Sequence, residues 1–248
     1  MKKLILVAAI SAAFSAGFVH AEEAKVEAKP DNEVSFNAAL ASDYRYRGIS
    51  QTRLQAALQG GADCTNNPSG LYVGAWLSNI KWIKDAGGKG NVEVDLYAGK
   101  RGEIVKDVSY DVGVLTYVYP SNDLVTSANT TEVYGQVGYG PAYIKYSHAV
   151  TNLFGFADSK NSGYLDLGSN FEIESGLILN AHLGRQMVKN NSHYSYNDRK
   201  VGITKDFGIV TAAVAVIGTN AGGIAYASPA NGKFLGKTSL VATLSKTF

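Results

Sequence analysis

The sequence lacks most of the features that stabilise or anchor other exported proteins. It has a single cysteine, Cys64, so no disulfide can form within the chain. Apart from its N-terminal segment, no stretch approaches about 18 consecutive apolar residues, which excludes a helical membrane protein. Proline is scarce, at 5 of 248 residues. The sequence contains no metal-ligand cluster and no nucleotide-binding loop, so we expect no cofactor and no metal.

The first 21 residues have the pattern of a secretory signal peptide. Lys2 and Lys3 precede an apolar run from Leu4 to Val19, and a cleavage site is expected after Ala21. The alternative is a membrane anchor, but a spanning helix needs about 20 apolar residues. Removing the two lysines from 23 basic residues leaves 21, equal to the 21 acidic residues. A neutral mature chain gives no support for a nucleic-acid partner.

The abundant residue types favour strands and turns. Glycine (27) and tyrosine (15) are abundant, and alternating segments are separated by turn sequences. Residues 22–33 form a short charged linker. The alternation predicts twelve strands over residues 34–248, at 34–47, 54–64, 70–82, 91–102, 108–119, 131–140, 142–151, 162–173, 177–188, 197–206, 209–218 and 237–248.

The predicted connections alternate between short and long, and the longer ones follow the odd-numbered strands. Outer-membrane barrels have short periplasmic turns and longer extracellular loops. The sequence therefore predicts an all-β fold, a single antiparallel transmembrane β-barrel, which would meet outer-membrane lipid. The last strand ends in Phe248, an aromatic terminus that resembles the signal recognised by the outer-membrane assembly machinery.

The stretch DYRYRGIS at residues 43–50 places charges and tyrosines on alternating positions. Side chains alternate between the two faces of a strand. Because arginine on the lipid face costs about 2–4 kcal/mol near the midplane, we expect Asp43, Arg45 and Arg47 to face the lumen. Tyr44 and Tyr46 are then expected on the lipid face, as interfacial aromatic residues.

The same alternation assigns further charged residues to the pore lining. The alternative is that these charges form ion pairs that fill a narrow lumen. The residues assigned are Glu93, Asp95, Arg101, Asp111, Glu132, Lys145 and Asp166.

Three blocks carry a resemblance to a known family: LASDYRYRGISQT at 40–52, ALQGG at 57–61 and GLYVGAWLSN at 70–79. Together they resemble the opening of the TorF-type porins of proteobacteria. The resemblance implies an outer-membrane barrel with channel activity. It implies no particular solute and no catalytic residue, and it gives Cys64 no role.

These observations leave three classes of function. The leading hypothesis is a passive channel for small solutes or ions, with selectivity set by charged side chains. A structural or adhesive barrel would act through its outer loops. A barrel hydrolase would need a nucleophile beside a base, and none is evident near His148, His182 or His193, so we do not expect an enzyme.

Overall fold

Twelve antiparallel strands close into a barrel in the computed structural model, which describes residues 30–248. The expected signal peptide, residues 1–21, lies outside this range. The barrel strands are β1 (Asn32–Ala41), β4 (Ala57–Asn66), β5 (Leu71–Asn79), β6 (Val92–Val105), β7 (Val108–Val118), β8 (Thr130–Tyr139), β9 (Ala142–Ala149), β10 (Gly163–Glu174), β11 (Leu177–Met187), β12 (Tyr196–Asp206), β13 (Thr211–Thr219) and β14 (Ser239–Thr247).

All twelve predicted strands are present, and the prediction of a single closed barrel is confirmed. The main difference lies in the first strand, which ends at Ala41 rather than at residue 47. The same strand begins at Asn32, within the stretch expected to be linker. The barrel closes where the last residue returns to the first strand. Phe248 N donates to Phe36 O at 2.8 Å, and Phe36 N donates to Phe248 O at 3.2 Å.

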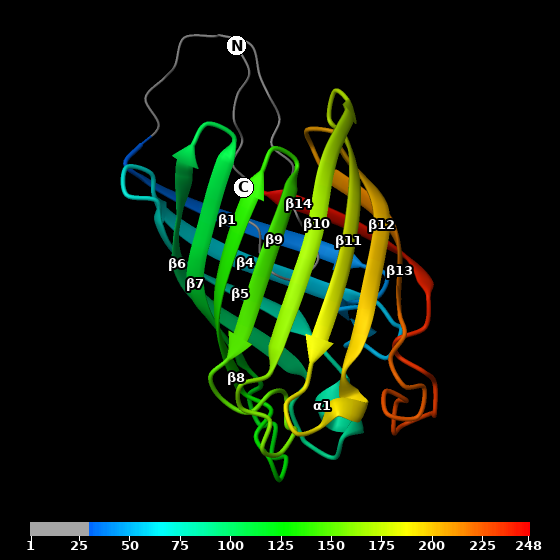
Figure 1. The fold of residues 1–248 in the computed structure, drawn as a ribbon. Helices are drawn as coiled ribbons and strands as arrows, with labels where there is room; N and C mark the ends of the chain where they lie inside the picture. The colour runs from blue at the N-terminus through cyan, green and yellow to red at the C-terminus, as the bar shows by residue number, and fades with distance from the viewer. Residues whose placement is uncertain (1–29) are drawn as a thin grey trace.

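The two ends of the barrel differ, as the loop lengths predict. In Figure 1 the short turns lie at the top and the long connections at the bottom. The first long connection contains two short strands, β2 (Arg45–Tyr46) and β3 (Ile49–Ser50). The second contains α1 (Trp82–Asp85), and the one before β12 contains the 3-10 helix η1 (Ser192–Tyr194). The chain within 30–248 has no helix long and apolar enough to cross a membrane.

The outward face of the barrel is apolar. Leu58, Leu183 and Leu240 are 69%, 62% and 68% exposed, although leucine is normally buried in a water-soluble protein. Inward positions on the same strands carry polar side chains such as Gln59, Asn180 and Thr243, which are buried. This alternation is that of a barrel whose outer wall contacts lipid.

Tyrosine rings cover glycines on one half of the inner wall. Gly99 of β6 pairs with Tyr72 of β5, and a methyl group on Gly99 would lie 2.4 Å from the Tyr72 hydroxyl. Such pairs recur around the wall from β5 to β10: Gly74 with Tyr97, Gly113 with Tyr134, and Gly168 with Tyr143. The opposite half carries small inward residues instead: Ala39, Ala41, Gly202, Ala213 and Ala215. Free space inside the barrel is therefore expected along β11–β14 and β1.

We predict that Gly99→Ala destabilises the barrel. Its new methyl group would also meet the Val112 carbonyl oxygen at 2.5 Å, and such overpacking costs about 1–3 kcal/mol. The urea midpoint of refolded protein would measure the loss. The control is Gly135→Ala, where the nearest atom is 3.9 Å away. Equal midpoints for the two variants would contradict the role of the tyrosine-covered glycines.

Candidate functional site

The chain turns into the barrel after β1 and forms a small hairpin inside it. We call residues 43–52 the inner hairpin. β2 and β3 pair at Tyr46 and Ile49, and the turn between them is Arg47-Gly48, with φ of 44° and 79°. Two consecutive positive φ angles are typical of the type I′ turn that links short hairpins. DYRYRGIS is therefore not the end of a transmembrane strand.

The prediction that Tyr44 and Tyr46 face lipid is wrong. Tyr44 is 2% exposed, and its hydroxyl donates to Glu93 Oε1 at 2.5 Å. The Tyr46 hydroxyl lies 2.6 Å from that of Tyr117 on β7. The expectation assumed that the strand alternation continues to residue 47. It ends at Ala41, so parity beyond that residue no longer reports which face a side chain occupies.

The carboxylate of Asp43 holds the inner hairpin together. Its Oδ1 accepts from Ser50 Oγ at 2.5 Å and from Thr52 Oγ1 at 3.2 Å. Its Oδ2 accepts from Arg45 Nε at 2.5 Å. Arg45 also donates from Nη1 to the carbonyl of Leu235, in the last long connection, at 3.1 Å. The hairpin is thus bound both to itself and to another outer loop.

Arg47, at the tip of the hairpin, reaches the far wall. Its Nη2 donates to Glu132 Oε2 of β8 at 2.6 Å, and its Nη1 donates to Gln186 Oε1 of β11 at 2.6 Å. The guanidinium carbon lies 4.1 Å from the ring centre of Tyr164 and 4.8 Å from that of Tyr46. Cation–π contacts and a buried ion pair therefore fix one side chain across the lumen.

Gly48 is required at the second turn position for two reasons. Its φ of 79° is a conformation that other residues adopt with strain. A methyl group there would lie 2.5 Å from Thr219 Cγ2 and 2.8 Å from Asp198 Cβ. The hairpin therefore packs closely against β12 and β13.

The charged residues expected to line the pore all lie inside the barrel, but they differ in their burial and in their partners. Glu93, Asp95 and Glu132 are 1%, 3% and 1% exposed. The two arginines of the hairpin pair with Asp43 and Glu132, not with Glu93 or Asp95. The inward positions of β6 to β10 also carry Arg101, Asp111, Lys145 and Asp166. Whether any of them lines a conducting path stays a prediction.

Several inner carboxylates accept hydrogen bonds from tyrosine hydroxyls, a feature that the sequence analysis missed. Tyr72 donates to Asp111 Oδ1 at 2.5 Å, and Tyr97 donates to Asp63 Oδ1 at 2.6 Å. The alternation in 57–66 would have placed Asp63 on the inner face. The high tyrosine count was the other available signal.

A second polar cluster lies on the inner wall of β10, β11 and β12. His182 Nδ1 is 2.7 Å from Asp166 Oδ1, and His182 Nε2 is 2.6 Å from Asp198 Oδ1. The Tyr164 hydroxyl donates to Asp198 Oδ2 at 2.9 Å. Both ring nitrogens therefore face carboxylates. Residues 30–248 contain no group of His, Cys, Asp and Glu side chains placed to hold a metal ion.

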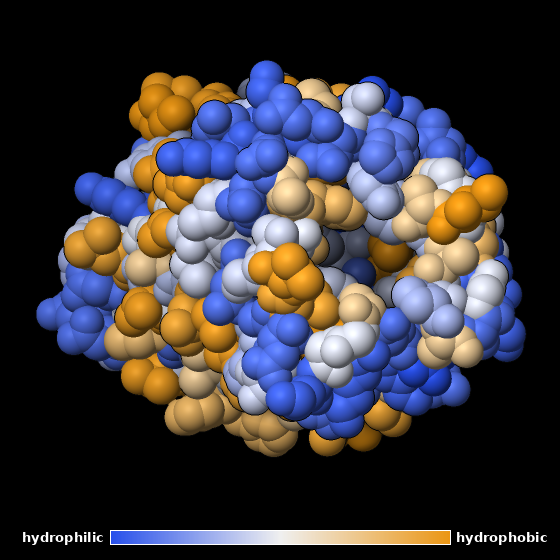
Figure 2. Space-filling view, turned by 90° about the horizontal axis from the view of Figure 1, so that it is seen from below, coloured by the Kyte–Doolittle hydropathy of each residue, from blue (hydrophilic) through white to orange (hydrophobic). Residues whose placement is uncertain are grey.

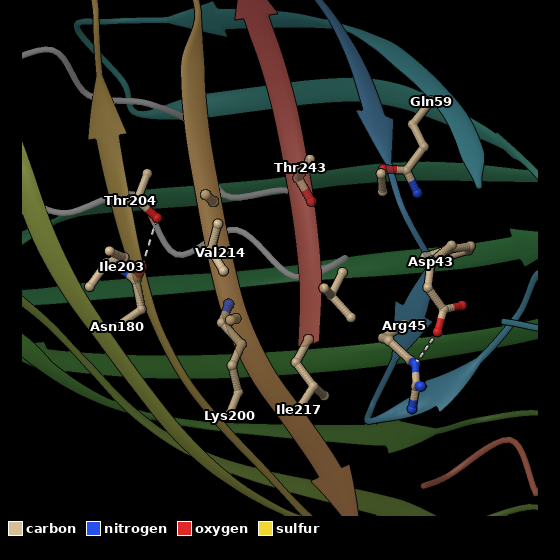
Figure 3. A pocket seen from close by; sticks show the side chains of 15 residues that line it. Asp43, Arg45, Gln59, Asn180, Lys200, Ile203, Thr204, Val214, Ile217 and Thr243 are labelled. Carbon is tan, nitrogen blue, oxygen red and sulfur yellow. Dashed lines mark hydrogen bonds and ion pairs between the residues drawn. The ribbon is translucent and has the colours of Figure 1, made fainter. Parts of the chain in front are cut away.

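A cavity lies between the inner hairpin and the small-residue wall. In Figure 3, Asp43 and Arg45 stand on one side, and Lys200, Asn180 and Thr204 on the other. The other labelled lining residues are Gln59, Ile203, Val214, Ile217 and Thr243. Figure 2, a view onto the end with the long connections, shows a hollow to the right of the centre. The lining mixes charged and polar side chains of both signs with small and branched apolar ones.

A comparison with known protein families identifies the family of this chain. The family described as "Bacterial protein of unknown function (Gcw_chp)" matches residues 25–248. The chain belongs to this family. That description does not carry the name TorF, so the likeness to TorF-type porins remains a resemblance. No curated protein matches the chain in sequence.

Solved structures share the barrel fold. The KdgM porin is 6% identical, with a TM-score of 0.53 over 87% of this chain and 97% of its own. A structure titled "Unveiling the Mechanism Behind the in-meso Crystallization of Membrane Proteins" is 10% identical, with a TM-score of 0.51 over 87% and 83%. LpxR from Salmonella typhimurium has a TM-score of 0.44 at 13% identity, over 86% and 99%. At these identities the likeness shows the fold alone.

We predict that Asp43→Asn releases the inner hairpin. The amide has one acceptor oxygen instead of two and no charge for Arg45, and a buried charge without its partner costs about 3–5 kcal/mol. Trypsin should then cleave folded protein after Arg45 or Arg47, as detected by mass spectrometry of the peptides. In the control Asp123→Asn, which removes an exposed ion pair with Lys89, both sites should stay protected. Protection in both variants would refute the role of Asp43.

Proposed function

We propose that the protein is an outer-membrane channel through which small solutes or ions diffuse passively. One observation carries the proposal: a closed barrel with an apolar outer wall encloses a cavity beside the inner hairpin, lined in part by Asp43, Arg45, Gln59 and Lys200. An apolar wall suits lipid, and charged and polar groups in the cavity can contact water and dissolved solutes. Twelve strands give a lumen between those of filled eight-stranded barrels and open sixteen-stranded ones.

Two likenesses support this proposal. The fold is shared with a protein named as a porin. The opening block at 40–52 resembles that of the TorF-type porins, and this resemblance also implies channel activity. In this proposal the long connections face the outside of the cell and the short turns face the periplasm.

The inner hairpin sets the width of the proposed path. It fills part of the outer half of the lumen, where Arg47 bridges to Glu132 and Gln186. The small residues Ala213 and Ala215 leave room on the other side, beside Lys200. Solutes would therefore pass off-centre, along β11–β14 and β1.

Phe248 is proposed to serve in assembly as well as in closing the barrel. The residue is 72% exposed while its backbone pairs with Phe36. An exposed terminal aromatic side chain is accessible to the assembly machinery before closure.

Liposome swelling tests the channel directly. Liposomes that contain the purified barrel should swell in small sugars and salts, with rates that fall as solute size rises. The proposal would be overturned if a barrel shown to be folded gave no swelling and no current in planar bilayers. That result would favour a structural or adhesive role.

Arg47→Ser should shift ion selectivity toward cations. The substitution leaves the carboxylate of Glu132 in the lumen without its guanidinium partner, and charged side chains set selectivity in pores. Reversal potentials in a salt gradient measure the change. The control Arg53→Ser removes the partner of Asp85 in the outer loops and should have less effect. Unchanged selectivity in conducting Arg47→Ser barrels would contradict the assignment.

A further inference from the structure

Two arginines stand on the outward, lipid-facing wall of the barrel, at the edge of its apolar surface. Arg185 of β11 and Arg199 of β12 are both exposed. Arg185 pairs with Asn197, two residues before Arg199 on the same face. Diagonal neighbours of this kind have Cα atoms about 7–8 Å apart. Two flexible guanidinium groups at this spacing can approach the same ligand.

The arginines mark the border of the apolar wall at the end with the long connections. Arg185 pairs with Leu165 of β10, and Arg199 pairs with Leu183 of β11. Leu183 is 62% exposed, and Val201, the next outward residue after Arg199, is 58% exposed. Arginine on a barrel exterior costs about 2–4 kcal/mol at the midplane but only about 0–1 near the interface. Both guanidinium groups are therefore expected at the level of the lipid headgroups.

No carboxylate neutralises this pair. Neither arginine forms a salt bridge with any residue of 30–248. Arg185 Nη1 donates to Asn197 Oδ1 at 3.1 Å, an uncharged partner. The adjoining long connections add two exposed lysines and one exposed acid: Lys160, Lys189 and Asp158. The net charge of this border is positive.

We infer that Arg185 and Arg199 bind the phosphorylated headgroup of a glycolipid in the outer leaflet. A guanidinium group donates two parallel hydrogen bonds to phosphate, and it is more weakly hydrated than an ammonium group. The leucines that flank the pair would contact the acyl chains of the same lipid. This site rests on the proposed outer-membrane location and orientation, but not on conduction.

The test uses the full barrel in detergent with lipid A that carries both phosphates. Native mass spectrometry should show bound lipid A, and the double variant Arg185→Gln with Arg199→Gln should bind about tenfold more weakly. Dephosphorylated lipid A should bind the unmodified protein as weakly. The matched control is Lys100→Gln, an exposed outward residue near the other end of the barrel, which should leave binding unchanged.

Equal affinity of the unmodified and double-variant barrels for lipid A would overturn the site, as would equal affinity for the two lipids. The charge-conserving variant, Arg185→Lys with Arg199→Lys, should bind better than the glutamine variant, which guards against a folding defect. Conductance in bilayers without lipid A separates this site from the channel. A barrel that conducts without binding lipid A refutes the site alone, and one that binds lipid A without conducting refutes the channel alone.

Discussion

The ion pair between Arg47 and Glu132 is the constraint on which the shape of the lumen depends. It joins the first long connection to β8 on the far side of the barrel, with both side chains nearly buried. A buried pair of this kind is costly to break, because either partner alone is an uncompensated charge. The inner hairpin therefore stays across the lumen, and the open space is displaced to one side.

The rest of the interior is consistent with that displacement. Tyrosine rings lie over glycines on the wall from β5 to β10 and donate to carboxylates such as Asp63 and Asp111. This half of the lumen is packed, and several of its carboxylates accept hydrogen bonds from tyrosine hydroxyls. Alanine and glycine occupy the other half, where the cavity is found. Large side chains fill the lumen along β5–β10, and small side chains leave a cavity on the opposite side.

The sequence predicted the barrel well because strand alternation and loop length are local signals. All twelve strands and the difference between the two ends follow from them. The inner hairpin could not be predicted in the same way. Tyr44 and Tyr46 keep perfect alternation beyond Ala41, so their parity indicated a strand that the turn at Asp43 interrupts. The partners of Arg47 lie 85 and 139 residues away in the chain, and no local pattern specifies them.

The most direct measurement is the single-channel conductance of a barrel without the inner hairpin. Ala41 and Ala57 are directly paired across β1 and β4, so a short hairpin turn can replace residues 42–56 without moving either strand. Our account predicts a severalfold larger conductance than that of the full barrel, with the cutoff for sugars moved to larger solutes. The same conductance and cutoff in both folded proteins would contradict the claim that this hairpin sets the width of the lumen.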